Sequence, residues 1–93
     1  MATNEVTKEQ ADLLTHTVGA GPHIKRRNHG YRNRFCAEVG SKHYAAMREM
    51  ERAGLVTSVG AINEGRDVYF MATLAGCEAI GLSKAATKRA MTE

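Results

Sequence analysis

A helix followed at once by a β-hairpin is the pattern that most strongly constrains the fold of this chain. Ser41 is a favourable N-cap and Gly54 stands where a helix-ending glycine is expected, so the residues between them predict an amphipathic helix. Two segments rich in β-branched residues follow, at 55–62 and 68–72, and a turn signal at 63–65 separates them. The sequence therefore predicts a helix that leads directly into two antiparallel strands.

Two further helices are predicted on either side of this pattern. Thr7 and Gln10 form a capping-box pattern, and the apolar residues after them fall on one helical face, so we expect a helix at about 7–18. Thr73 is placed to cap a shorter helix that ends near Gly81. The predicted order is helix, connection, helix, hairpin and helix.

The connection at residues 23–40 shows neither helical nor strand periodicity. Residues 35–39 are compatible with a short strand or with one helical turn. We expect the 93-residue chain to be a single domain with an ordered core at 7–82 and flexible tails at 1–6 and 83–93.

Positive charge is concentrated in residues 23–34, which we call the basic segment. The whole chain has a net charge of only +3, but this segment holds five cations and no acid. The last eleven residues also carry a positive balance. Cationic side chains without counter-charges typically meet phosphate groups or an acidic protein surface.

The passage from Arg48 to Val56, ending Ala-Gly-Leu-Val, resembles the end of the recognition helix in winged-helix DNA-binding proteins. The passage Tyr69 to Gly76, with Thr-Leu-Ala-Gly at its end, resembles the strand and helix that close such domains. The resemblance covers about residues 41–82 and implies an α+β, winged-helix-like fold: three helices with a two-stranded β-hairpin wing. The chain departs from the family because no compact second helix is evident before residue 41, unless a short one lies within 33–39.

A second resemblance concerns the origin of the chain. Tyr31-Arg-Asn-Arg-Phe-Cys36, followed by Gly40-Ser41 and Ala53-Gly-Leu55, is similar to small phage and prophage proteins of unassigned activity. The similarity implies a phage or prophage origin and no particular chemistry.

The winged-helix resemblance also implies which residues contact DNA. The outward side of the 42–52 helix would meet base edges, the wing tip would touch the backbone, and the basic segment would supply phosphate contacts. The candidate nucleic-acid-binding residues are Lys25, Arg26, Arg27, Arg32, Arg34, Ser41, Lys42, Ala45, Arg48, Arg52 and Arg66. A plain solvated helix face remains the alternative for 42–52, because Glu49 and Glu51 would repel phosphate and could pair with the arginines.

Metal and catalytic chemistry find little support in the pattern of side chains. His23, His29, Cys36 and His43 are separated by five, six and six residues, whereas structural zinc sites show close ligand pairs. No nucleotide-binding loop or oriented nucleophile is evident. We expect no metal, no cofactor and no enzymatic activity.

The sequence favours a nucleic-acid-binding protein of phage or prophage origin that regulates transcription or otherwise binds double-stranded DNA in the cytoplasm. We expect no membrane association, and residues 74–91 are the candidate element for a homodimer. A protein-interaction factor that binds a host or phage protein is the first alternative, and a single-strand or RNA binder is the second. The preferred interpretation requires the basic segment and the outward face of 42–52 to lie on one side of the molecule.

Overall fold

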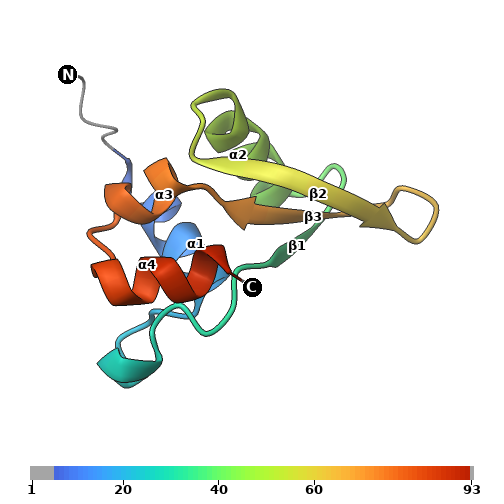
Figure 1. Ribbon diagram of the computed structural model, residues 1–93. Coiled ribbons are helices and arrows are strands. Elements are labelled where there is room, and N and C mark those ends of the chain that lie inside the picture. The colour runs from blue at the N-terminus through green and yellow to red at the C-terminus, as the bar shows by residue number, and fades with distance from the viewer. Residues whose placement is uncertain (1–5, 93) are drawn as a thin grey trace.

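The computed structural model describes residues 6–92, which form an α+β arrangement of four α-helices and a three-stranded antiparallel sheet (Figure 1). Most of the predicted tail at 1–6 lies outside the described residues. The elements are α1 (Lys8–Val18), a 3-10 turn η1 (Arg26–Asn28), β1 (Phe35–Glu38), α2 (Lys42–Arg52), β2 (Val56–Ile62), β3 (Asp67–Ala72), α3 (Leu74–Ala79) and α4 (Lys84–Met91). Among the described helices, none has the length and apolar character that crossing a membrane requires.

The predicted helix starts are confirmed by their caps. Thr7 accepts a hydrogen bond from the Gln10 amide, and the Gln10 side chain accepts one from the Thr7 amide, both at 3.1 Å. Ser41 caps α2 through the Tyr44 amide, and Thr73 caps α3 in the same way. Each cap satisfies a backbone donor that the first helical turn leaves free.

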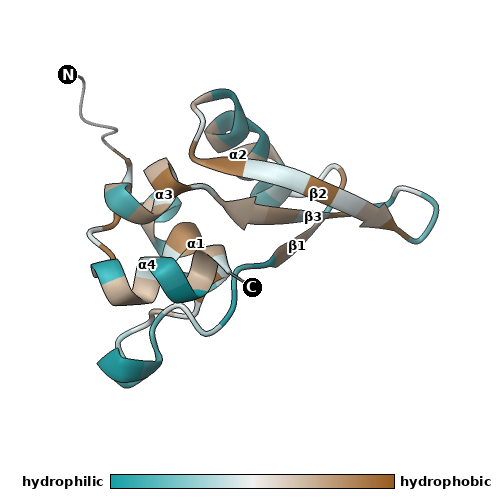
Figure 2. Ribbon diagram, viewed as in Figure 1, coloured by the Kyte–Doolittle hydropathy of each residue, from teal (hydrophilic) through white to brown (hydrophobic). Residues whose placement is uncertain are grey.

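The sheet contains the predicted hairpin and one additional strand. β2 and β3 pair across the hydrophilic turn that Figure 2 shows at the far end of the molecule. β1 pairs with the other edge of β3, with Phe35 opposite Phe70. Residues 35–38 are therefore a strand and not a helical turn, and no second helix lies within 33–39. The expected two-stranded wing is corrected to a three-stranded sheet in the order β1-β3-β2.

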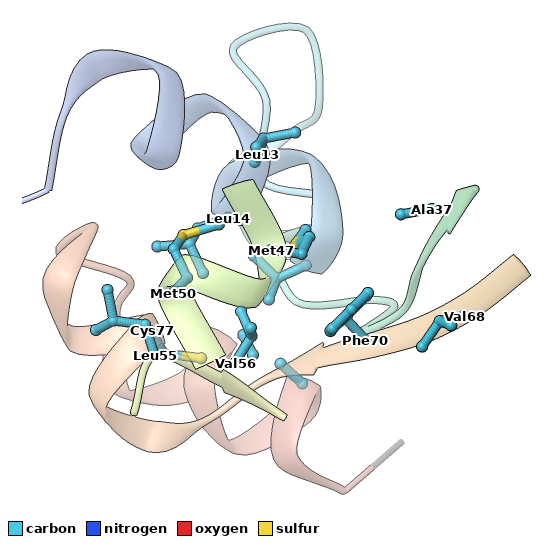
Figure 3. Close-up of a cluster of buried hydrophobic side chains, with 13 residues drawn as sticks. Leu13, Leu14, Ala37, Met47, Met50, Leu55, Val56, Val68, Phe70 and Cys77 are labelled. Atoms are coloured by element: carbon cyan, nitrogen blue, oxygen red, sulfur yellow. The ribbon is translucent and has the colours of Figure 1, made fainter. Parts of the chain in front are cut away.

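The core lies between one face of this sheet and helices α1 and α2 (Figure 3). Leu14, Met47, Met50 and Phe70 are fully buried there. Because side chains alternate along a strand, the neighbour of Phe70 in β3, Tyr69, lies on the opposite face of the sheet, where it is partly exposed.

α3 packs closely against the chain at the start of β2, and the glycine of the Thr-Leu-Ala-Gly passage makes this contact. A Cβ atom at Gly76 would stand only 2.2 Å from the Leu55 carbonyl oxygen, so only glycine fits at this contact. Cys77, the next residue, is fully buried in the core.

Residues 83–92 correct the expectation of a flexible tail at 83–93 and of only three helices, while residue 93 lies outside the described residues. Ser83 caps α4, and Ala86 and Ala90 on its inner side are fully buried. The side-chain amide of Asn33 donates to the Ala90 carbonyl at 3.3 Å. The helix was not predicted because its buried stripe consists of alanines, which produce little hydrophobic periodicity.

Candidate nucleic-acid interface

The basic segment leaves α1 and then runs alongside α4. The Gly30 amide donates to the Val18 carbonyl at 3.0 Å, and Gly30 itself lies so close to α4 that a Cβ would stand 2.1 Å from the Ala86 oxygen. The Arg89 side chain donates to the His29 carbonyl at 3.0 Å. The segment is therefore attached to α4 at His29 and Gly30, although it contains little regular structure.

The five cations of the basic segment have two different environments. Lys25, Arg26 and Arg27 are exposed around η1. Arg32 is half-buried, and its Nε and Nη2 atoms donate to the His16 carbonyl at 3.1 and 2.7 Å. Arg34 is exposed, with its guanidinium 5.8 Å from the centre of the Tyr69 ring. The first three are free to contact a ligand, while Arg32 and Arg34 are held by the protein itself.

Helix α4 adds three exposed cations that were absent from the predicted site. Together with the basic segment they form what we call the basic surface: Lys25, Arg26, Arg27, Arg32, Arg34, Lys84, Lys88 and Arg89. Neither 19–37 nor 79–92 contains a carboxylate. None of the three ion pairs among the described residues involves a member of this surface. The net positive charge of residues 83–93 was the sequence signal for these three cations. Because we expected these residues to form a flexible tail, nothing in the sequence placed them beside the basic segment.

Charge is consequently segregated within the molecule. The described residues outside the basic surface carry five cations and eight carboxylates, which is a net charge of −3. Figure 2 shows strongly hydrophilic residues at η1 and on α4, and Figure 1 shows that these two elements lie at the same end. A positive end of this kind creates a local potential that attracts polyanions.

Arg48 on α2 is engaged inside the fold. Its side chain donates to the Tyr44 hydroxyl at 2.9 Å and to Glu51 at 2.5 Å, and it lies over the Phe70 ring. Glu51 also accepts hydrogen bonds from the amide and hydroxyl of Ser58 on β2. The hydrogen bond from Arg48 is the main cause that lowers the pKa of Glu51 below its ordinary value. This network ties α2 to the sheet and neutralises the arginine.

The other predicted contacts on α2 and the hairpin carry little free positive charge. Ser41 is occupied as the helix cap. The outward face of α2 presents four exposed residues of mixed charge: Lys42, Ala45, Glu49 and Arg52. Lys42 lies 4.0 Å from Glu9 of α1. Arg66 is exposed at the hairpin turn, in a stretch that also contains Glu64 and Asp67.

The predicted convergence of the basic segment with α2 does not occur. Figure 1 shows η1 and α2 at opposite ends of the molecule. Arg34 stacks on Tyr69, which lies on the face of the sheet opposite to α2. The condition on which the preferred interpretation depended is therefore not met, and the basic segment lies against α4 instead, at His29 and Gly30.

Among residues 6–92, no group of three or more His, Cys, Asp or Glu side chains is placed to hold a metal ion. No protein-family model matches the chain, and no curated protein or solved structure matches it significantly. A functional assignment therefore depends on the geometry and the charge of the basic surface.

Proposed function

We propose that the protein binds nucleic acid through phosphate contacts made by the basic surface, and that it acts by binding without catalysis. The observation that carries this proposal is the set of cations on two packed segments that contain no carboxylate. A polyanion binds such a surface favourably because its phosphates and the cationic side chains neutralise each other and release their bound small ions. Most other partners would have to supply several acidic groups in the same arrangement. Phosphate contacts of this type do not depend on base sequence.

Double-stranded DNA is the partner that the winged-helix resemblance favours, and we retain it as the first substrate to test. The succession of α2, hairpin and Thr73-capped α3 supports that resemblance. We do not propose base readout by α2, because Arg48 is paired internally and Glu49 would face the phosphates. A transcription-regulating role in a phage or prophage, in the host cytoplasm, is proposed from the resemblance alone.

The test compares two double charge reversals that change the net charge equally. Arg26→Glu with Arg27→Glu alters the basic surface, and Lys42→Glu with Arg52→Glu alters the exposed face of α2. Fluorescence anisotropy with a labelled random duplex at about 50 mM salt gives the affinities. We expect the first variant to lose at least about tenfold in affinity and the second to lose less than about threefold.

An equal loss in the two variants would show that only the overall charge matters and would contradict the assignment of the interface. Absence of any binding by the unaltered protein at low salt would contradict the function itself. Circular dichroism confirms that both variants remain folded, since all four side chains are exposed.

A protein partner is the second candidate, and one apolar groove favours it. The groove between α3 and α4 measures about 350 Å³ and is lined by Leu74, Leu82 and Met91, with Lys84, Lys88 and one carboxylate, Glu78, beside them. Leu74 is 54% exposed and Met91 is 43% exposed, so the groove presents two large apolar side chains to solvent. Such a groove suits an acidic segment with an apolar side chain on a host or phage protein. Saturable binding of an acidic amphipathic peptide that Leu74→Asp abolishes, without any binding of DNA, would favour this candidate.

A further inference from the structure

A hollow of about 380 Å³ opens beside the basic surface, between the second half of α1 and the loop at residues 19–32. Its size lies in the lower part of the range of small-ligand pockets. The side chains that give it chemical character are Asp12, Thr15, His16, His23, Tyr31 and Arg32.

Tyr31 forms an exposed and firmly held aromatic wall of this hollow. The ring is 47% exposed, yet its edge lies against Gly19, where a Cβ would stand 2.3 Å from Cε1. The Tyr31 amide donates to the Asn28 carbonyl at 3.1 Å. Gly19 thus has two roles, because it also ends α1 in the left-handed conformation with φ 68°.

Arg32 lies over one face of the ring. Its guanidinium lies 5.3 Å from the centre of the Tyr31 ring, and two of its nitrogens donate to the His16 carbonyl at the end of α1. The arginine is therefore held in one orientation before any ligand arrives. A prearranged aromatic and cationic pair loses little conformational entropy when it binds a flat ring.

The neighbouring hollow links this wall to the phosphate-binding cations. It measures about 250 Å³ and is lined by Arg26, His29 and Ser83, and it shares Thr15 with the first hollow. The two hollows therefore adjoin through one side chain. Arg32 lines the first hollow and Arg26 lines the second, so each hollow has a cation of the basic surface in its wall.

We propose that the hollow at Tyr31 binds an unpaired nucleobase of the nucleic acid that the basic surface holds, so this inference rests on the proposed function. The ring of Tyr31 stacks on the base, and Thr15, His16, His23 and Asp12 offer hydrogen-bond partners to its edge. Bases inside a duplex are paired and stacked and cannot enter. The hollow therefore adds affinity for single strands or unpaired positions, and none for an intact duplex.

The experiment measures anisotropy with three labelled probes: a single strand of about 12 nucleotides, the same strand with abasic sites at every position, and a duplex of the same length. We expect Tyr31→Ala to weaken binding of the normal single strand by about 5- to 100-fold and to leave the duplex within about twofold. Tyr31→Phe should bind the normal single strand about as tightly as the unaltered protein, because it keeps the stacking ring. Ile62→Ala, which removes an exposed apolar side chain from β2 near the hairpin turn, is the matched control and should leave all three affinities unchanged.

The abasic probe tests the inference even if Tyr31→Ala folds poorly. The unaltered protein should bind the abasic strand at least about fivefold more weakly than the normal strand, since the phosphates remain and the bases are gone. Equal affinity for normal and abasic strands, or equal loss by Tyr31→Ala on strand and duplex, would overturn the base-binding site while leaving the phosphate contacts intact. No binding of any probe would instead overturn the proposed function.

Discussion

Two residues before β1 begins, the side chain of Asn33 makes the hydrogen bonds to β3 that a strand residue would otherwise make. Its side-chain oxygen accepts from the Ala72 amide at 2.7 Å, and its nitrogen donates to the Ala72 carbonyl at 3.0 Å and to the Ala90 carbonyl. The side chain is 2% exposed. One amide group therefore completes the edge of β3 and fastens the end of α4 to it.

Replacing this side chain leaves buried backbone groups without partners. We expect Asn33→Ala to lower the free energy of unfolding by about 3 kcal/mol, because an unsatisfied buried amide costs more than the hydrogen bond contributes. Asn28→Ala, at an exposed position of η1, is the control and should change it by less than about 0.5 kcal/mol. Urea denaturation measures both. A loss below about 1 kcal/mol for Asn33→Ala would mean that water replaces the amide.

Glu51 makes part of the stability depend on pH. Because Arg48 and Ser58 lower its pKa in the folded state, the carboxylate stabilises the fold above the ordinary value of 4.5, and this contribution is lost as the pH falls through the lower folded value. We expect Glu51→Gln to lose about 1 kcal/mol at about pH 7 and progressively less as the pH is lowered below 4.5. Urea unfolding over this pH range checks this. Glu49→Gln, exposed on the same helix, should show only a small loss throughout the range, and a similar pH dependence there would contradict the role of the network.

At the scale of elements, α4 and the basic segment form one unit. The segment has few apolar side chains, and α4 buries mainly Ala86 and Ala90. Their association therefore depends on close backbone approach at Gly30 and on the hydrogen bond from Arg89 to His29. Such contacts are sensitive to a single added methyl group.

Two glycines allow this sensitivity to be measured. Gly30 and Gly40 both have left-handed φ angles, of 81° and 90°, but nothing lies within 4 Å of a Cβ at Gly40. Gly40→Ala should therefore cost about 1 kcal/mol, for the backbone alone. Gly30→Ala should cost about 2 kcal/mol more, because its methyl group would displace α4. Thermal unfolding measures the difference, and equal losses in the two variants would show that α4 adjusts without strain.

At the scale of the whole molecule, positive charge is concentrated on the basic surface, although Glu78 lies beside Lys84 and Lys88. The end formed by η1 and α4 carries the basic surface, while the remaining described residues are net acidic. Removing one cation should therefore affect binding of a polyanion according to its position and not only according to its charge.

The salt dependence of binding makes this testable. We expect Lys88→Gln to reduce the slope of log affinity against log salt concentration by about 0.9 for duplex DNA, which corresponds to one lost phosphate contact. Lys42→Gln, the matched removal of an exposed lysine on α2, should leave the slope unchanged. Equal reductions would mean that the duplex contacts both ends.

The parts of the fold that the sequence predicts are those with local signals. Thr7, Ser41 and Thr73 each act within three residues, so the three helices they cap are evident in the sequence. β1 could not be distinguished from a helical turn because the residues of β3 with which it pairs lie 29 to 35 positions further along the chain. α4 was expected to be a flexible tail because alanines bury well in a close contact but are equally common in exposed helices.

Some residues of the candidate site were also evident from the sequence, and others became evident only from the structure. The cations of the basic segment were evident from charge alone, whereas the contribution of Lys84, Lys88 and Arg89 required the position of α4. Pairing of Arg48 with Glu51 was foreseeable from their spacing in a helix. Its contact with Phe70 and the link from Glu51 to Ser58 were not, because both depend on where the sheet lies.

The separation of charge also gives the protein a permanent dipole moment. In the field of a long polyanion such a moment produces a torque that turns the positive end forward before the surfaces touch. The molecule is 36 Å long, while electrostatic fields decay over about 30 Å at about 0.01 M salt and over about 8 Å at about 0.15 M. Orientation before collision is therefore effective only in dilute salt. In a cell, most encounters would begin with the protein in a random orientation, and it would have to rotate while already close to its partner.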